Sequence, residues 1–423
     1  MYRTKPVIRP RAGFWIGLVF AIVSLGFAAF SGYWVMYRLG YALVGVLLVS
    51  YVWTRVSLRG LQAEVDRHTD RVQEGEDIVE RITVRNESAI PKLWIEIQDP
   101  TEVPSHHARF VVSLPSKGRR SRRVATRCER RGVYSIGPLQ IASGDPFGLY
   151  SASMSIGPAE SILVYPRPIE LTNFEVPAAN LPGDGRFRRR THYVTPNSAG
   201  IREYAIGDSF NRIHWPSTAR LGQLMVKLFE LDPASDIWIA LDLQETAQAG
   251  EGMDGTEEVG VRIAASIARA LLVGNRSVGL LAYGARLHTI EADRGQQQLT
   301  HILEALAMAQ ATGDVSLGDL LFQEGRRFGR HTTVVAVTAS LDEQWVTALQ
   351  GLAQRGVRTA AIYMEPETFG AGESSLLVFG ALMAADLPAH FVRRGDDLRA
   401  ALSPGGQDAS RQELISGQKD RQA

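Results

Sequence analysis

A run of residues with reactive or strongly polar side chains lies between positions 200 and 220, in the sequence GIREYAIGDSFNRIHWPSTAR. Its notable members are glycines, arginines, aromatic rings and one carboxylate, at Gly200, Arg202, Tyr204, Gly207, Asp208, Arg212, Trp215 and Arg220. Arginine pairs with carboxylates and stacks on aromatic rings, and glycine permits tight turns. We interpret the run as a buried polar network that joins two domains. The alternative is that the same arginines also meet a protein partner or an anionic ligand.

Catalysis is the competing hypothesis for this run, for instance by a hydrolase that uses Asp208 and His214. We expect no enzyme activity and no catalytic residues. The sequence has no GxxxxGK[ST] nucleotide-binding loop, no HExxH motif and no cysteine-rich zinc spacing. Cys128 lies among arginines, which would lower the pKa of its thiol, but no paired base accompanies it. His106 and His107 are interpreted as surface histidines.

Composition and charge set the broad class of the protein. The 423 residues allow two or three domains, and 45% apolar with 22% charged residues is typical of a folded chain. A single cysteine forms no intramolecular disulfide and fits a reducing compartment. Residues 1–200 hold 26 Lys and Arg against 17 Asp and Glu, whereas the remainder holds 20 against 28. A basic first half favours an anionic lipid surface.

Two uncharged, apolar segments stand near the N-terminus. One covers 26 residues between Arg11 and Arg38, and the other covers 16 residues between Arg38 and Arg55. A membrane-spanning helix needs about 20 apolar residues, and Arg38 can snorkel to the membrane surface to lengthen the second segment. A cleaved signal peptide is the alternative, but the first run is too long and a second follows at once. Residues 1–58 therefore predict a transmembrane helical hairpin.

The basic residues that flank the hairpin predict its orientation. Arg9 and Arg11 precede it, Arg55 and Arg59 follow it, and Arg38 is the only charge in the connection. Cytoplasmic loops carry the excess of Lys and Arg. We therefore expect a multi-pass protein of the cell membrane, with two helices and with its soluble domains in the cytoplasm.

Residues 59–170 carry the pattern of a β-rich domain. Segments such as DIVERITVRN and KLWIEIQD alternate apolar and polar residues, which indicates an antiparallel sandwich. The run 116–131 holds eight basic residues, but no aromatic stacking platform is interleaved, so we expect no nucleic-acid binding. In the turn GDPFGLY, at 144–150, we expect Asp145 to cap the turn and Phe147 to anchor it in a core.

Residues 233–402 alternate strand and helix patterns, beginning with the nearly continuous apolar strand SDIWIALDLQ. This alternation predicts a doubly wound α/β domain with a parallel sheet. Residues 171–232 form the segment that links it to the β-rich domain. Residues 403–423 have few large apolar side chains and predict a disordered tail.

The segments GDPFGLY, VYPRP and G-x-R-x-Y-x-x-G-D-x-x-x-x-I-x-W-x-x-x-A-R occur in this order, followed by the strand and helix pattern. Together they resemble the bacterial family called "domain of unknown function 58", over roughly residues 10 to 400. The resemblance implies a von Willebrand factor A-like final domain. It also implies a membrane-anchored scaffold in an envelope or complex-assembly system. Its expected partners are a MoxR-type AAA+ ATPase and other von Willebrand A proteins.

Von Willebrand A domains often bind Mg²⁺ through a D-x-S-x-S motif after the first strand, so the resemblance also suggests a metal site. Asp242 matches this motif, while Gln244 and Thr246 replace its two serines. Ser316 and Ser340 stand near the later ligand positions. Because hard oxygen ligands bind Mg²⁺, a weak ion at Asp242, Gln244 and Thr246 is conceivable. We favour a degenerate site and expect no cofactor.

Overall fold

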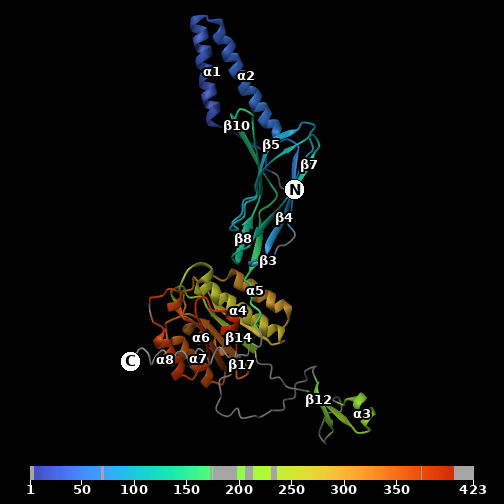
Figure 1. The fold of residues 1–423 in the computed structure, drawn as a ribbon, viewed down its shortest axis with the longest axis vertical. Coiled ribbons are helices and arrows are strands. Elements are labelled where there is room, and N and C mark those ends of the chain that lie inside the picture. Colours follow the sequence, from blue (N-terminus) through green and yellow to red (C-terminus); the bar gives the residue numbers. More distant parts are fainter. Residues whose placement is uncertain are drawn as a thin grey trace. The chain divides into compact units, whose positions relative to one another are not determined.

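The computed structural model describes residues 4–67, 71–171, 174, 198–204, 213–229, 236–372 and 374–403 (Figure 1). The chain divides into two compact units, Met1–Arg167 and Pro168–Ala423. The predicted tail from residue 404 onward lies outside the described residues.

Two long apolar helices, α1 (Ala12–Ser31) and α2 (Trp34–Ser57), form an antiparallel pair near the N-terminus. Both are long and apolar enough to cross a membrane. Gly32, with φ of 67°, ends α1 and turns the chain. Gly40 lets the helices approach closely, because a Cβ there would lie 2.4 Å from the Leu25 side chain. The two apolar helices predicted from the uncharged runs are thus confirmed.

The remainder of the first unit is built from short strands in three sheets. Their order is β1-β10-β9-β5-β6, β2-β4-β7 and β3-β11-β8. The strands are β1 (Val7–Pro10), β2 (Leu61–Arg67), β3 (Arg71–Gln73), β4 (Asp77–Asn86), β5 (Lys92–Gln98), β6 (Arg109–Leu114), β7 (Arg119–Arg127), β8 (Gly132–Ile136), β9 (Leu139–Gly144), β10 (Tyr150–Ile156) and β11 (Glu160–Tyr165).

Alternating side chains from two of these sheets share one core. Ile82 and Val84 of β4 belong to the same buried cluster as Ile95 and Ile97 of β5, as the period-two pattern of these strands predicts. The first unit differs in two details from the predicted antiparallel sandwich with a separate helical hairpin before it. Strand β1 lies before the helices yet pairs with β10, and β11 pairs with β3 in parallel.

The helix pair contacts the β-rich part of its own unit directly. The Nζ of Lys92, at the start of β5, donates to the carbonyl of Val56 in the last turn of α2 at 2.5 Å. Lys92 is buried, and burial lowers its pKa. The ring of Tyr150 in β10 lies 5.1 Å from that of Phe14 in α1 and 5.8 Å from that of Tyr51 in α2. Both helices are therefore packed against the strands that follow them.

In the second unit a six-stranded sheet has the order β16-β15-β14-β17-β18-β19, and only β16 runs antiparallel to its neighbour. Its strands are β14 (Asp236–Asp242), β15 (Val278–Tyr283), β16 (Leu287–Asp293), β17 (Thr332–Thr338), β18 (Arg358–Met364) and β19 (Ala389–Val392). Its main helices are α4 (Thr256–Val273), α5 (Gln296–Met308), α6 (Leu317–Glu324), α7 (Gln344–Gln354) and α8 (Leu376–Ala384). A short α9 (Leu398–Ala401) follows β19.

Helices cover both faces of this sheet. One face buries Trp238 and Ala240 of β14 in a cluster with residues of α6, α7 and α8, including Trp345. On the other face Gly260 of α4 comes close to Leu241 and Met364. The sequence pattern predicted the alternating strands and helices but not β16, whose seven residues are mostly half-exposed.

The strand order reverses between β14 and β17. The chain passes from β14 to β15 in one direction and from β17 to β18 and β19 in the other. In open α/β sheets this reversal leaves a crevice at the carboxyl ends of the two central strands, where ligands usually bind. Asp242 and Thr338 are the last residues of these two strands.

Candidate functional site

Asp242 occupies the end of β14 at this reversal and is almost fully buried. Its Oδ2 accepts a hydrogen bond from the Thr338 hydroxyl at 2.6 Å, and its Oδ1 accepts from the Gln244 backbone N–H at 3.1 Å. Thr338 in turn accepts from the backbone N–H of Ser340 at 2.9 Å. Each carboxylate oxygen is therefore held by a neutral donor of the same domain.

The loops around Asp242 are held in place by backbone pairing and close approach. Gly313 forms a parallel bridge with Gln244, and a Cβ at this glycine would lie 2.5 Å from the Tyr283 carbonyl oxygen. Gln248 donates to the carbonyls of Asp242 and Gln244, and accepts from the Thr256 hydroxyl at 2.8 Å. These contacts fix the loop after β14 against α4 and the loop after α5.

Burial raises the pKa of Asp242 from its ordinary value of 3.8 to about 6, and the hydrogen bonds from Thr338 and Gln244 oppose this rise only in part. With this pKa the carboxyl of Asp242 is mostly ionised at neutral pH and becomes protonated as the pH falls below about 6. Such a perturbed group at a strand reversal is the kind of residue found at functional sites.

The structure describes the surroundings of each predicted metal ligand. Gln244 reaches Asp242 through its backbone N–H, and Thr246 is exposed on a short 3-10 helix. Ser316 caps α6, where its hydroxyl contacts Asp319. In the described part of the chain, no cluster of metal-ligating His, Cys, Asp or Glu side chains includes Asp242.

The motif between positions 200 and 220 is only partly described. Strand β12 (Ser198–Glu203) pairs antiparallel with β13 (Met225–Phe229), and α3 (Trp215–Leu221) lies between them in sequence. The backbones of Gly200 and Arg202 lie in β12. Asp208, together with Gly207 and Arg212, lies outside the described residues. Tyr204 is half-buried, and its backbone N–H donates to the Leu224 carbonyl at 2.8 Å. Trp215 and Arg220 are exposed on α3.

His214 has a local structural contact. Its Nδ1 accepts from the backbone N–H of Ser217 at 3.3 Å and lies 2.8 Å from the Ser217 hydroxyl oxygen, so the imidazole caps the N-terminus of α3.

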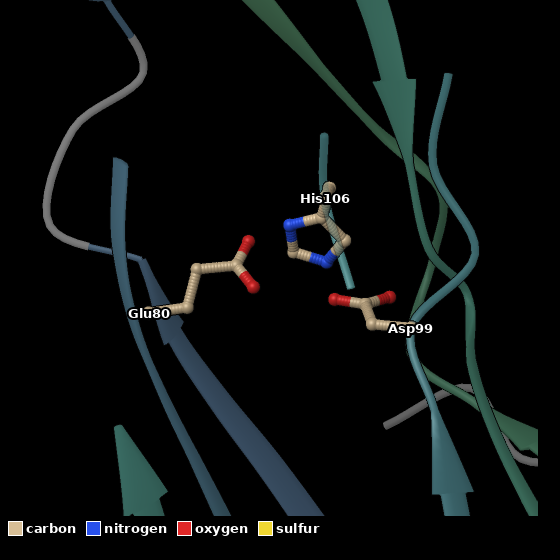
Figure 2. Close-up of side chains that lie close together, drawn as sticks. All are labelled: Glu80, Asp99 and His106. Atoms are coloured by element: carbon tan, nitrogen blue, oxygen red, sulfur yellow. The ribbon is translucent and has the colours of Figure 1, made fainter. Parts of the chain in front are cut away.

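A second polar cluster lies inside the β-rich part of the first unit (Figure 2). Glu80 of β4, Asp99 just after β5, and His106 each offer one ligand atom, and these atoms lie within 4.8 Å of one another. The carboxylates are buried and His106 is half-buried. The sequence patterns did not predict this group. Its signal was that Glu80 has the same strand parity as the buried Ile78 and Ile82.

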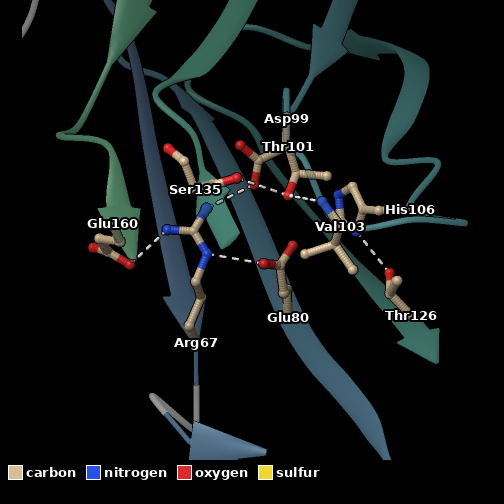
Figure 3. A network of polar contacts seen from close by, with 9 residues as sticks. All are labelled: Arg67, Glu80, Asp99, Thr101, Val103, His106, Thr126, Ser135 and Glu160. Atoms are coloured by element: carbon tan, nitrogen blue, oxygen red, sulfur yellow. Dashed lines mark hydrogen bonds and ion pairs between the residues drawn. The ribbon is translucent and has the colours of Figure 1, made fainter. Parts of the chain in front are cut away.

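Arg67 of β2 supplies the positive charge in this cluster (Figure 3). Its guanidinium donates to Glu80 at 2.8 Å, to Asp99 at 2.7 Å and to the half-exposed Glu160 at 2.6 Å. Burial alone would lower the pKa of Arg67, but these three carboxylates raise it. A metal ion beside Glu80 and Asp99 would be repelled by the guanidinium. We therefore interpret the cluster as a buried ion-pair network that joins β2, β4 and β11.

Three side chains of this region differ from their sequence interpretation. His106 is not a plain surface histidine, because its Nδ1 lies 2.7 Å from the Thr126 hydroxyl and burial lowers its pKa. Cys128 is buried, and burial raises the pKa of its thiol to about 11 in spite of the neighbouring arginines. Asp145 caps its turn as predicted, but Phe147 is 62% exposed and anchors no core.

In the comparisons with known proteins, one family model matches residues of the second unit. The sequence model of the family described as "Protein of unknown function DUF58" matches residues 200–367, from β12 to just beyond β18. The "Uncharacterized protein YeaD" of Bacillus subtilis (strain 168) is 25% identical over 330 residues, which cover 75% of this chain and 80% of that protein. The chain is thus similar to this family and this relative.

Similarity to solved structures is slight. The CARDB domain of PF1109 from Pyrococcus furiosus, solved with di-metal ions, is 12% identical and has a TM-score of 0.19. It covers 25% of this chain and 86% of that chain. The C-terminal domain of wzt is 9% identical, with a TM-score of 0.19, covering 25% of this chain and 73% of that one. At these scores neither structure carries an argument about function.

Proposed function

We propose that this protein is a membrane-anchored cytoplasmic docking platform, without bond-making chemistry of its own. The observation that carries the proposal is the packing of both apolar helices against the β-rich part of the first unit. The Lys92–Val56 hydrogen bond and the contacts of Tyr150 with Phe14 and Tyr51 make the anchor part of a folded body. A platform held firmly at a membrane suits the assembly of protein partners.

The charges beside the helices support a cytoplasmic location. Arg11 directly precedes α1, and Arg55 and Arg59 lie in or beside the last turn of α2. Gly32 and Tyr33, which connect the helices, carry no charge, and Arg38, the single basic residue near this end, lies in the first turns of α2 and stacks over Trp34. The positive-inside rule then puts the strands on the cytoplasmic side.

The second unit is proposed to have a von Willebrand A-like fold that serves as an interaction domain. Support comes from the central β14 with an aspartate at its carboxyl end, and from the antiparallel edge strand β16. Because the carboxylate of Asp242 is already held by Thr338 and Gln244, the crevice favours protein docking over a tightly bound metal.

The partner is proposed from the family resemblance, as a MoxR-type AAA+ ATPase, with other von Willebrand A proteins as further candidates. The exposed Trp215 in α3 is a suitable contact residue, because exposed aromatic residues and arginines often carry the binding energy of interfaces. Among the described residues nothing favours the hydrolase that would use Asp208 and His214, since His214 caps α3 and Asp208 lies outside them.

Binding of the full-length protein in nanodiscs to the purified MoxR-type ATPase of the same cell would test this proposal. Trp215→Ala should weaken binding roughly tenfold or more, as expected for an aromatic contact residue. Phe322→Ala is the matched control, because Phe322 is an exposed aromatic residue of α6 outside the 200–220 motif. Absence of binding by the unaltered protein, or turnover of an ester or peptide substrate that is lost with His214→Ala, would contradict the proposal.

A further inference from the structure

Four exposed apolar side chains lie at the end of the β-rich part where the helices join it. They are Ile90 at 49%, Leu93 at 53%, Trp94 at 75% and Phe147 at 62% exposure. We define these four residues as the apolar rim. Large aromatic and aliphatic side chains exposed together mark interaction surfaces.

The strand registers place the residues of the apolar rim at the same height along the strands. Ser151 of β10 pairs with Gly144 of β9, and Glu96 of β5 pairs with Ala142 of β9. The first residues of β5 therefore lie level with Tyr150 at the start of β10. Phe147 is at the tip of the turn between β9 and β10, and its own backbone N–H is held by Asp145 at 2.9 Å.

The same level coincides with the expected boundary of a bilayer. The ring of Tyr150 contacts Tyr51 in α2. From Trp34 to Tyr51 the helix rises by about 26 Å at 1.5 Å per residue, close to the ~30 Å thickness of a hydrocarbon core. If α2 crosses the membrane, Tyr51 and the rim beside it fall in the headgroup layer, where Trp and Tyr concentrate.

The local backbone presents two consecutive apolar residues to this layer. The pairing of β5 with β6 is irregular between Lys92 and Ile95, and Trp94 has a φ of 57°. A bulky residue in the left-handed region is strained and is retained where function requires it. As a result Leu93 and Trp94 are both exposed, while Lys92 and Ile95 on either side are buried.

Basic side chains accompany the apolar rim. Arg59 follows α2, and the backbone N–H of Lys117 donates to the Ser88 carbonyl in the loop that carries Ile90. Arg119 begins β7 opposite Arg85 of β4. Arg59, Lys117 and Arg119 are all exposed. Lys and Arg near a surface of anionic lipid are attracted to it, each adding to the binding.

We propose that the apolar rim and its basic neighbours form a second membrane contact, inserted into the anionic headgroup layer of the bilayer that the helices span. This contact rests on the proposed membrane anchoring. Together with helices α1 and α2, which pack against the β-rich part, it would fix the height and tilt of this body at the membrane. The occupant of the surface is the phospholipid bilayer and not a protein.

Quenching of a fluorophore by labelled lipids tests this contact in the full-length protein. Trp94→Cys and, separately, Phe147→Cys are coupled to an environment-sensitive dye. The proteins are placed in nanodiscs of phosphatidylglycerol and phosphatidylcholine that contain lipid with a nitroxide near the headgroup end of its acyl chain. The native Cys128 is buried with a raised thiol pKa, and the parent protein measures its background labelling.

Val133→Cys is the matched control, because Val133 is 53% exposed in β8, far from the helices along the domain (Figure 1). We expect the dyes at 94 and 147 to be quenched roughly threefold or more strongly than the dye at 133, as for side chains in the headgroup layer. Equal quenching at all three positions would refute the contact. Equal quenching at 94 in discs of phosphatidylcholine alone would refute the role of the basic neighbours.

A fourth position separates this inference from the anchoring on which it rests. Phe20 is exposed in the middle of α1. A dye on Phe20→Cys should be quenched by a nitroxide deep in the acyl chain if the helix crosses the bilayer. No quenching at position 20 would contradict the anchoring itself. Quenching at 20 without quenching at 94 and 147 would overturn only the contact of the apolar rim.

Discussion

Two buried carboxyl sites, one in each unit, are stabilised in opposite ways. In the first unit Glu80 and Asp99 are paired with the guanidinium of Arg67. In the second unit Asp242 is held only by the neutral donors Thr338 and Gln244. The guanidinium provides an opposite charge that compensates the buried carboxylates for their lost hydration. A carboxylate with neutral partners instead has a raised pKa, which for Asp242 is about 6.

This difference assigns different roles to the two sites. Arg67 of β2 pairs with Glu80 of β4, with Asp99 and with Glu160 of β11, so the role of this network is to hold these strands together. Asp242 is a carboxyl group whose pKa of about 6 lies near physiological pH. It stands at the strand reversal, where open α/β sheets bind their ligands. The second site is therefore the better candidate for a response to a partner.

Arg67→Met should give the largest effect, because it leaves Glu80 and Asp99 buried without a compensating charge. Removing one partner of a buried ion pair costs about 3–5 kcal/mol of unfolding free energy. The rate at which the thiol of the buried Cys128 becomes accessible to labelling, in detergent with increasing denaturant, measures opening of this unit.

Arg109→Met is the matched control for that experiment, since Arg109 pairs with Glu96 on the exposed side of β6. Exposed pairs contribute about 0–1 kcal/mol. Similar labelling of Cys128 in Arg67→Met and Arg109→Met would show that the network contributes nothing beyond a surface ion pair.

Asp242→Asn should change how stability depends on pH. The pKa of Asp242 is raised in the folded state, so the folded protein binds the proton more tightly than the unfolded chain. Its contribution is full below pH 4 and is lost as pH rises towards and past 6. A rise from 3.8 to about 6 corresponds to about 3 kcal/mol.

In the asparagine variant this loss between pH 4 and 7 should disappear. The fluorescence of the buried Trp238 and Trp345 during unfolding reports on this unit. An unaltered pH profile in Asp242→Asn would mean that another group titrates over this range.

Thr338→Val removes the hydroxyl that donates to Asp242 and should make the stability of the second unit depend more strongly on pH. The hydrogen bond favours the charged form, so its loss raises the pKa of Asp242 above about 6. At pH 8 the cost should be about 1–3 kcal/mol, and it should shrink at pH 4, where the carboxyl is protonated. Thr359→Val is the control, because its buried hydroxyl has no hydrogen-bond partner among the described residues. An equal cost in both variants at pH 8 would contradict the proposed bond.

The sequence predicted local patterns well and distant pairings poorly. Uncharged runs predicted α1 and α2, and the apolar strand before Asp242 predicted β14, because hydrophobic periodicity is a local property. The Arg67 network was missed because its members are far apart in sequence and meet only through strand pairing. The single local sign of the network was that Glu80 lies on the same, buried side of its strand as Ile78 and Ile82.

The candidate sites show the same limit. Asp242 was singled out by its match to the D-x-S-x-S motif, whereas its partner Thr338 is 96 positions away and was not predicted. Phe147 was expected in a core because it is aromatic, yet its turn lies where the sheet meets the helices. Strand β1 could not be predicted as part of the sheet, because its partner β10 follows it by more than a hundred residues.

Glu160→Gln should have the smallest effect on the unfolding free energy, and it separates the contribution of the exposed ion pair from that of the two buried ones. Glu160 accepts from Arg67 at 2.6 Å, but its side chain is 49% exposed, so water screens the pair. Its loss should cost at most about 1 kcal/mol in the Cys128 labelling experiment, because Glu80 and Asp99 still compensate the guanidinium. A cost close to that of Arg67→Met would show that the exposed carboxylate holds Arg67 in place, so that the buried pairs depend on it.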